Sequence, residues 1–85
     1  MNILFSSRGW DDYVHWQRTD RKLVKKINEL LRDIARDSYS GIGKPEPLKY
    51  ALSGYWSRRI TEEHRLVYRV EGKTIKVAQA RYYYE

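Results

Sequence analysis

A glutamate held between two prolines is the part of this chain best suited to chemistry. In the run Lys44-Pro45-Glu46-Pro47-Leu48-Lys49, a single carboxylate stands among cations. Each proline fixes its own φ angle and pushes the residue before it toward extended geometry, so Glu46 cannot easily leave its place. A fixed carboxylate suits a general base, and nearby cations stabilise a phosphate that gains negative charge during reaction. The residues predict an RNA-cleaving site, with an exposed loop glutamate as the simpler alternative.

A ribonuclease that works without a metal needs a base for the 2′-OH proton, cations for the phosphate oxygens and an acid for the leaving 5′ oxygen. Glu46 is the candidate base. Guanidinium groups match phosphate oxygens and keep their charge, which makes strand arginines candidate phosphate contacts. The candidate cations are Arg59, Arg65, Arg81, Lys44 and Lys49. Any single strand arginine has a simpler reading, because arginines often cover a sheet face and pair with nearby glutamates.

Three consecutive tyrosines follow Arg81. Tyrosine rings stack on unpaired bases and donate a phenolic proton, while their alternative role is packing against Trp56 or the helices. Strand alternation predicts that Tyr82 points inward and Tyr83 outward. The histidines, His15 and His64, are better read as surface or hydrogen-bonding residues than as general bases.

Length, charge and cysteine content limit the classes of function. The 85 residues fit one domain, 1–85, with one layer of helix on one sheet. The net charge of +6 and the pI near 9.7 predict an acidic partner, which nucleic acid, a membrane surface or an acidic protein would satisfy. Without a bilayer-length apolar run or a signal-peptide pattern, we expect a cytoplasmic protein. With no cysteine and two histidines, we expect neither disulfides nor a metal cofactor.

Two helices are predicted in the first half of the chain. Ile3-Leu4-Phe5 is typical of a short buried strand, and Ser6-Ser7 are candidate helix caps. The spacing of Trp10, Tyr13 and Val14 predicts a short amphipathic helix over residues 8–17. Asp20 is a candidate N-cap for a longer helix with the apolar stripe Leu23, Val24, Ile27, Leu30, Leu31 and Ile34. The charged face of that helix is read as solvated surface in preference to an RNA groove.

The second half predicts an antiparallel sheet with strands at 48–52, 55–60, 65–70 and 74–83. An odd-length connection at residues 61–63 would place Arg59 opposite Arg65, and an even one would separate them. A three-residue turn at 71–73 would put Arg65 and Val67 on the face of Gln79, Arg81 and Tyr83, leaving a cationic, aromatic face free for a ligand. The predicted fold is α+β, with two N-terminal helices packed on one face of a mainly antiparallel twisted sheet.

Several motifs along the chain point to one family. They are Gly9-Trp10-Asp11-Asp12-Tyr13, residues 24–30, Gly43-Lys44-Pro45-Glu46-Pro47-Leu48-Lys49, Ser53-Gly54 and residues 56–68. With them the chain resembles, over nearly its whole length, the YoeB-type toxins of bacterial toxin–antitoxin pairs, within the RelE-like ribonuclease superfamily. The resemblance implies a microbial-ribonuclease-like fold and an endoribonuclease that enters the ribosomal A site and cuts the mRNA codon there. It also implies that Glu46 is the general base, that Arg65 stabilises the transition state, and that Arg59 and Lys49 help to hold the RNA.

One position departs from that family. YoeB-type toxins usually end in Arg-Tyr-His-Tyr, with the histidine as general acid, and here Tyr83 stands at that place. Some RelE-like relatives use a tyrosine there, so Tyr83 is the expected acid and Tyr84 a stacking or positioning residue. A tyrosine, with an ordinary pKa of about 10, donates a proton less readily than an imidazolium, so we expect slower cleavage or a higher pH optimum.

The resemblance further implies an acidic antitoxin of the YefM or Phd type, whose flexible segment would cover the basic face. Operator DNA would be contacted mainly through that partner, and a homodimer is possible within this family. Two other functions stay open from the residues alone. One is a basic module that binds the ribosome or RNA without cutting it, and the other is a ribonuclease that needs no ribosome.

Overall fold

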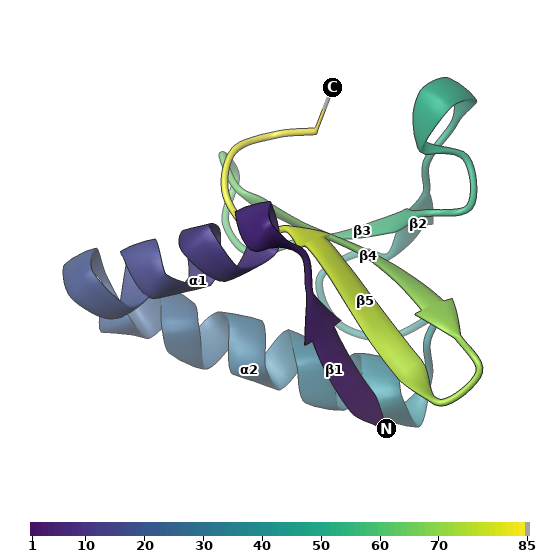
Figure 1. Ribbon diagram of the computed structural model, residues 1–85, viewed down its shortest axis with the longest axis horizontal. Coiled ribbons are helices and arrows are strands. Elements are labelled where there is room, and N and C mark those ends of the chain that lie inside the picture. The colour runs from purple at the N-terminus through teal and green to yellow at the C-terminus, as the bar shows by residue number, and fades with distance from the viewer. Residues whose placement is uncertain (85) are drawn as a thin grey trace.

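Two helices cover one face of a five-stranded sheet (Figure 1). The computed structural model describes residues 1–84, so Glu85, the last residue of the predicted domain, lies outside the described part. The elements are β1 (Asn2–Phe5), α1 (Ser7–Thr19), α2 (Arg21–Arg36), β2 (Glu46–Pro47), the 3₁₀ helix η1 (Tyr50–Leu52), β3 (Trp56–Arg59), β4 (Arg65–Glu71) and β5 (Thr74–Gln79). The sheet order is β1-β5-β4-β3-β2, with β1 parallel to β5 and the other pairs antiparallel. The predicted α+β fold is confirmed.

Side-chain caps set the ends of both helices. The Ser6 hydroxyl accepts a hydrogen bond from the Gly9 N–H at 3.0 Å, and the Asp20 carboxylate accepts one from the Lys22 N–H at 3.1 Å. Asp20 also ends α1, since its own N–H donates to the Trp16 carbonyl. One residue therefore closes the first helix and opens the second, which confirms both predicted caps. Neither helix of residues 1–84 is long and apolar enough to cross a membrane.

The predicted apolar stripe of α2 packs against the sheet. Ile27, Leu30 and Ile34 are fully buried against inward residues of β4 and β5 such as Leu66 and Ile75. Burial of such side chains contributes about 1.5–3 kcal/mol each, so this interface stabilises the packing of α2 on the sheet. The helices therefore cover one face of the sheet, and the other face is not covered by them. That second face, turned away from α1 and α2, is called the outer face below.

Strand register brings the candidate residues to the outer face. Arg59 pairs with Arg65, as an odd-length connection predicts, and Glu46 pairs with Ser57. The β4–β5 turn has two residues, not three, because Glu71 pairs with Thr74. A register shift follows at Val67/Tyr68, where Tyr68 pairs with Val77 and Val67 with Gln79. A two-residue turn alone would place Val67 and Gln79 on opposite faces of the sheet, but the extra residue of the bulge returns them to the same face. The prediction that Val67 and Gln79 share a face is therefore confirmed, although the turn length on which it was based is not.

Two predicted strands are wrong in their extent. Residues 48–52 were expected to be a strand, but Tyr50 has φ +57° and begins the short helix η1, so only Glu46–Pro47 pairs with β3. The strand expected over 74–83 ends at Gln79. There the Ala80 N–H donates to Asp12 and its carbonyl accepts from the Trp16 indole, so both backbone groups bond to α1 and not to a neighbouring strand. Hydrogen bonds to side chains of α1 therefore end β5 earlier than the amino-acid composition predicts.

Candidate active site

The base candidate and the last residue of β5 lie in one cross-strand row on the outer face. Glu46 pairs with Ser57, Ser57 with Val67 and Val67 with Gln79. Residues paired across strands project to the same side of a sheet, as do residues two apart along a strand. The pair of Arg59, two positions after Ser57, and Arg65, two positions before Val67, therefore lies on the outer face in the next row. Arg58, between Ser57 and Arg59, projects to the helical side and is fully buried.

Glu46 is exposed and held by both backbone and side chain. It belongs to β2, its neighbours Pro45 and Pro47 restrict its backbone, and its Oε1 accepts a hydrogen bond of 3.0 Å from the Tyr84 hydroxyl. The second carboxylate oxygen, Oε2, is left for another donor. A carboxylate with one oxygen fixed and the other open has the geometry of a general base.

Arg65 is nearly buried beneath the Thr61–His64 turn. Its Nη1 donates to the carbonyls of Thr61 at 2.7 Å, Glu62 at 2.9 Å and His64 at 3.2 Å. Within residues 1–84, all hydrogen bonds of this guanidinium leave from Nη1, so Nη2 and Nε stay available for an anion. Its central carbon also lies 4.7 Å from the centre of the Tyr83 ring. The charge of Arg65 is thus fixed in place and in contact with the predicted acid.

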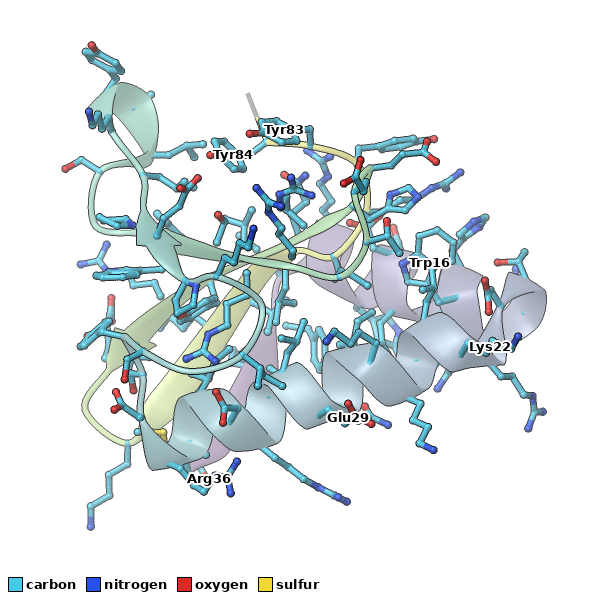
Figure 2. All side chains as sticks on the ribbon, turned by 180° about the vertical axis from the view of Figure 1, so that it is seen from behind. Trp16, Lys22, Glu29, Arg36, Tyr83 and Tyr84 are labelled. Atoms are coloured by element: carbon cyan, nitrogen blue, oxygen red, sulfur yellow. The ribbon has the colours of Figure 1, made fainter. Side chains whose placement is uncertain are left out.

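Tyr83 and Tyr84 are stacked above the outer face, on the side away from α2 (Figure 2). Their ring centres are 4.6 Å apart with 23° between the planes. Burial, followed by the contacts with Tyr83 and the Glu46 carboxylate, raises the pKa of Tyr84 to about 12. The Tyr84 phenol therefore stays protonated near neutral pH and keeps donating to Glu46. Tyr84 therefore makes the hydrogen bond to Glu46, whereas the Tyr83 ring packs against the Arg65 guanidinium.

The inward orientation predicted for Tyr82 is wrong. Its side chain is 53% exposed, about as much as that of Tyr83 at 51%. The φ of Tyr82 is +65°, a left-handed conformation that breaks the strand alternation on which the prediction depended. Residues 81–84, called the tyrosine segment below, therefore fold back over the sheet and do not continue β5.

The remaining cation candidates occupy different places. Lys44, Lys49 and Arg59 are exposed, and Lys49 lines a hollow of about 500 Å³ with the rest of residues 46–52 and Tyr84. Tyr50, 93% exposed, stands on the same hollow, and the sequence reasoning missed it. The Arg81 guanidinium instead packs on Trp16 of α1 at 5.9 Å and on Tyr82 at 4.6 Å. Lys49 is therefore brought beside Glu46, whereas Arg81 lies beside α1.

Several positioning residues escaped the sequence reasoning. Asp12, named there only as part of a family motif, is 9% exposed and accepts a hydrogen bond from the Ala80 N–H at 3.0 Å. Gln79 is 8% exposed and contacts the tyrosine segment. A signal for Asp12 did exist, because its spacing of four from Trp16 puts both on one face of α1. Residues 1–84 hold no group of three or more His, Cys, Asp or Glu side chains placed to bind a metal ion.

Comparison with known proteins gives consistent matches over the whole chain. Residues 5–84 match the sequence profile of the YoeB-like toxin of bacterial type II toxin–antitoxin systems. Toxin YoeB of Streptomyces coelicolor is 60% identical over 99% of this chain and 100% of its own length. A YoeB/ParE toxin from Agrobacterium tumefaciens superposes with a TM-score of 0.96 at 52% identity, covering 99% of this chain and 100% of that one.

YoeB from Staphylococcus aureus, solved as a dimer and in a YoeB–YefM complex, is similar in both forms. The TM-score is 0.93 in each, at 54% and 53% identity, covering 99% of this chain and 98% of that one. The outer face with Glu46, Arg65 and the stacked tyrosines therefore lies in a fold shared, almost without gaps, with these proteins.

Proposed function

The chain belongs to the family of YoeB-like toxins of bacterial type II toxin–antitoxin systems, and on that basis we propose that it is a ribosome-dependent mRNA endoribonuclease. It would cut mRNA in the ribosomal A site by acid–base catalysis through attack of the 2′-OH, and so inhibit translation. The observation that carries the proposal is the shared outer face, on which Glu46 and Arg65 meet the stacked Tyr83 and Tyr84.

Glu46 is the proposed base. Its Oε2 would take the 2′-OH proton while Oε1 stays bonded to Tyr84. The 2′ oxygen then bonds to phosphorus, the bond from phosphorus to the 5′ oxygen breaks, and a 2′,3′-cyclic phosphate forms. Arg65 would place its unused Nη2 and Nε on the phosphate oxygens as they gain charge. Fixing that cation beforehand through three carbonyl contacts reduces the reorganisation needed during the reaction.

Tyr83 is the proposed acid for the leaving 5′ oxygen. Its exposed ring lies against the Arg65 guanidinium, so a phosphate held by Arg65 would be near the Tyr83 hydroxyl. Tyr84, neutral because of its raised pKa, would orient Glu46 and offer a stacking surface for a base. Exposed Lys44, Lys49 and Arg59 would hold the RNA backbone. Arg81 would add charge from the side of α1.

The proposed partners follow from the relatives and from charge. YoeB of S. aureus has been solved with YefM and as a dimer, which supports an antitoxin of the YefM or Phd type and a homodimer for this chain. A net charge of +6 suits both an acidic antitoxin segment and RNA. Operator DNA would be contacted through the antitoxin complex.

The test is cleavage of end-labelled mRNA in programmed bacterial ribosomes by the unmodified chain, Glu46→Gln and Tyr83→Phe. Glu29→Gln on the exposed face of α2 (Figure 2) is the matched control, since it removes the same charge. We expect a cut in the A-site codon with a 2′,3′-cyclic end, a rate loss of about 10²–10⁴-fold in E46Q and Y83F, and no loss in E29Q.

Other outcomes separate the alternative functions. Ribosome binding without cleavage by the unmodified chain would leave a basic binding module. Equal cleavage of free RNA would indicate a ribonuclease that needs no ribosome. Full activity in E46Q would exclude Glu46 as the base.

A further inference from the structure

We propose that Gln79 is a positioning residue that holds the tyrosine segment, residues 81–84, over the outer face so that Tyr84 reaches Glu46. Gln79 does not touch the reacting atoms of the proposed reaction. It acts through the backbone of the segment that carries Tyr83 and Tyr84. The part of this inference that concerns rate depends on the proposed ribonuclease function, whereas the part that concerns the segment does not.

The contacts of Gln79 converge on that backbone. Its Nε2 lies 2.8 Å from the carbonyl oxygen of Arg81, 3.3 Å from that of Tyr82 and 3.1 Å from that of Tyr83. Three acceptors around one amide nitrogen require the NH₂ group to face them, since the amide oxygen would be repelled. With the residue only 8% exposed, these bonds are partly shielded from water. Loss of the donor would leave the Arg81 and Tyr83 carbonyls without it, whereas the Tyr82 carbonyl would keep the Arg65 N–H at 3.0 Å.

Within residues 1–84, groups other than Gln79 bond to the backbone of this path only as far as Tyr82. Asp12 and Trp16 bind the two backbone groups of Ala80, and His64 Nδ1 accepts from the Tyr82 N–H at 2.8 Å. Within residues 1–84, the hydrogen bond to the Tyr83 backbone comes from Gln79. Gln79 is therefore the residue that holds the backbone of Tyr83, while the two rings themselves contact Arg65 and Glu46.

The place of Gln79 in the sheet explains why this anchor matters for the site. Gln79 and Glu46 stand at opposite ends of the four-strand row that includes Ser57 and Val67, about 14 Å apart at the usual strand spacing. The segment leaves β5 at Gln79 and turns at Tyr82 through φ +65°, a conformation a tyrosine rarely adopts unless its surroundings impose it. It then crosses back until Tyr84 donates to Glu46.

The experiment compares Gln79→Met with Gln17→Met. Methionine keeps the length and apolar contacts of Gln79 without a donor, and Gln17, exposed on α1, gives the same exchange away from the site. Gln79→Asn is a second variant, which keeps an amide but is one methylene too short to reach Tyr83. Backbone ¹⁵N relaxation of Tyr83 and Tyr84 reports the order of the segment, and single-turnover ribosomal cleavage reports the rate.

In Q79M and Q79N we expect the order parameters of Tyr83 and Tyr84 to fall from about 0.85 to below about 0.6. The cleavage rate should fall by about 10²-fold, as displacement of catalytic groups by about 1 Å does, with ribosome affinity within twofold of the unmodified chain. Unchanged order in either folded variant would overturn the proposal, as would lost order with an unchanged rate. If the unmodified chain does not cleave, the proposed function fails, and the order parameters still decide whether Gln79 holds the segment.

Discussion

At the scale of single residues, the Tyr84 hydroxyl and the Glu46 carboxylate act as one unit. The hydroxyl donates at 3.0 Å, and ionising it would set two negative charges side by side. This repulsion, added to burial and the contact with Tyr83, keeps the Tyr84 phenol neutral beyond the pH at which a free tyrosine ionises. The carboxylate thereby retains its donor throughout the near-neutral pH range.

The raised pKa of Tyr84 predicts loss of stability in alkali. Its folded value of about 12 exceeds the unfolded value of about 10, so the folded state holds a proton that the unfolded state has lost. The associated stabilisation is full below about pH 10 and is lost as pH rises toward about 12. In Tyr84→Phe, the free energy of unfolding should therefore fall less steeply over this window, measured by urea denaturation at each pH.

Tyr50→Phe is the matched control, because Tyr50 is 93% exposed. Absorbance titration of the phenols should lose a late step in Y84F. Tyr68, whose pKa is raised by burial, still titrates late in both variants. Equal pH dependence of unfolding in Y84F and the unmodified chain would contradict the role given to Tyr84.

At the scale of elements, α1 approaches β5 so closely that a glycine is needed between them. A Cβ on Gly9 would lie 2.7 Å from the Val77 carbonyl oxygen, closer than real side-chain atoms come. The first turn of α1 also bonds to β5 through Ser6, whose N–H donates to that same carbonyl at 2.9 Å. A Cβ at position 9 would collide with backbone atoms of β5, which cannot move aside as the end of a flexible side chain can.

Gly9→Ala should therefore destabilise the protein although alanine is the better helix former. We expect a loss of about 1–3 kcal/mol in the free energy of unfolding, as for other overpacked sites. Gln17→Ala, exposed on the same helix, should stay within about 0.5 kcal/mol of the unmodified chain. Urea denaturation measures both, and a G9A variant that gains stability would show that α1 can move away from β5.

Element identity was largely predictable, and element ends were not. Apolar spacing located α2, and Asp20 marked its start, because both signals are local. The end of β5 at Gln79 depends on Asp12 and Trp16, which lie more than sixty residues earlier in the chain. The bulge beside Val67 likewise appears only when two strands are paired. Parity gave the face of Arg65 for an odd-length connection, whereas the pairing of Glu46 with β3 and its contact with Tyr84 depend on the paths of the loop before β2 and of the tyrosine segment.

At the scale of the whole molecule, Arg58 joins α2, the sheet and the loop that leads to Glu46. It is fully buried and pairs with Asp33 of α2. It also donates to the carbonyls of Asp37 at 2.8 Å, Ser40 at 2.9 Å and Ile42 at 3.1 Å. Removal of Asp33 would leave an unpaired cation in the interior, which is a strongly destabilising change.

Asp33→Asn should destabilise the protein at neutral pH, and the effect should fade in acid. The bond from Arg58, then those from the Ile42 N–H and Arg36, hold the pKa of Asp33 below its ordinary value. A lowered carboxyl pKa contributes stability above about pH 4, which is lost as pH falls through the folded value. Urea denaturation at pH 7 and pH 3 should show a large difference from the unmodified chain at pH 7 and a smaller one at pH 3.

Asp11→Asn on the exposed side of α1 provides the control for the lost charge. It should leave the urea midpoint nearly unchanged at both pH values. A D33N variant as stable as D11N at pH 7 would show that the Arg58 pair is replaceable.

The parallel pairing of β1 with β5 has a consequence for synthesis of the chain. β1 is synthesised long before its hydrogen-bonding partner, residues 74–79, and Glu46 gains its donor only with Tyr84. These long sequence separations delay folding until nearly all of residues 1–84 have emerged. A nascent chain therefore lacks both the β1–β5 pairing and the contact of Tyr84 with Glu46 until its synthesis has passed these late residues.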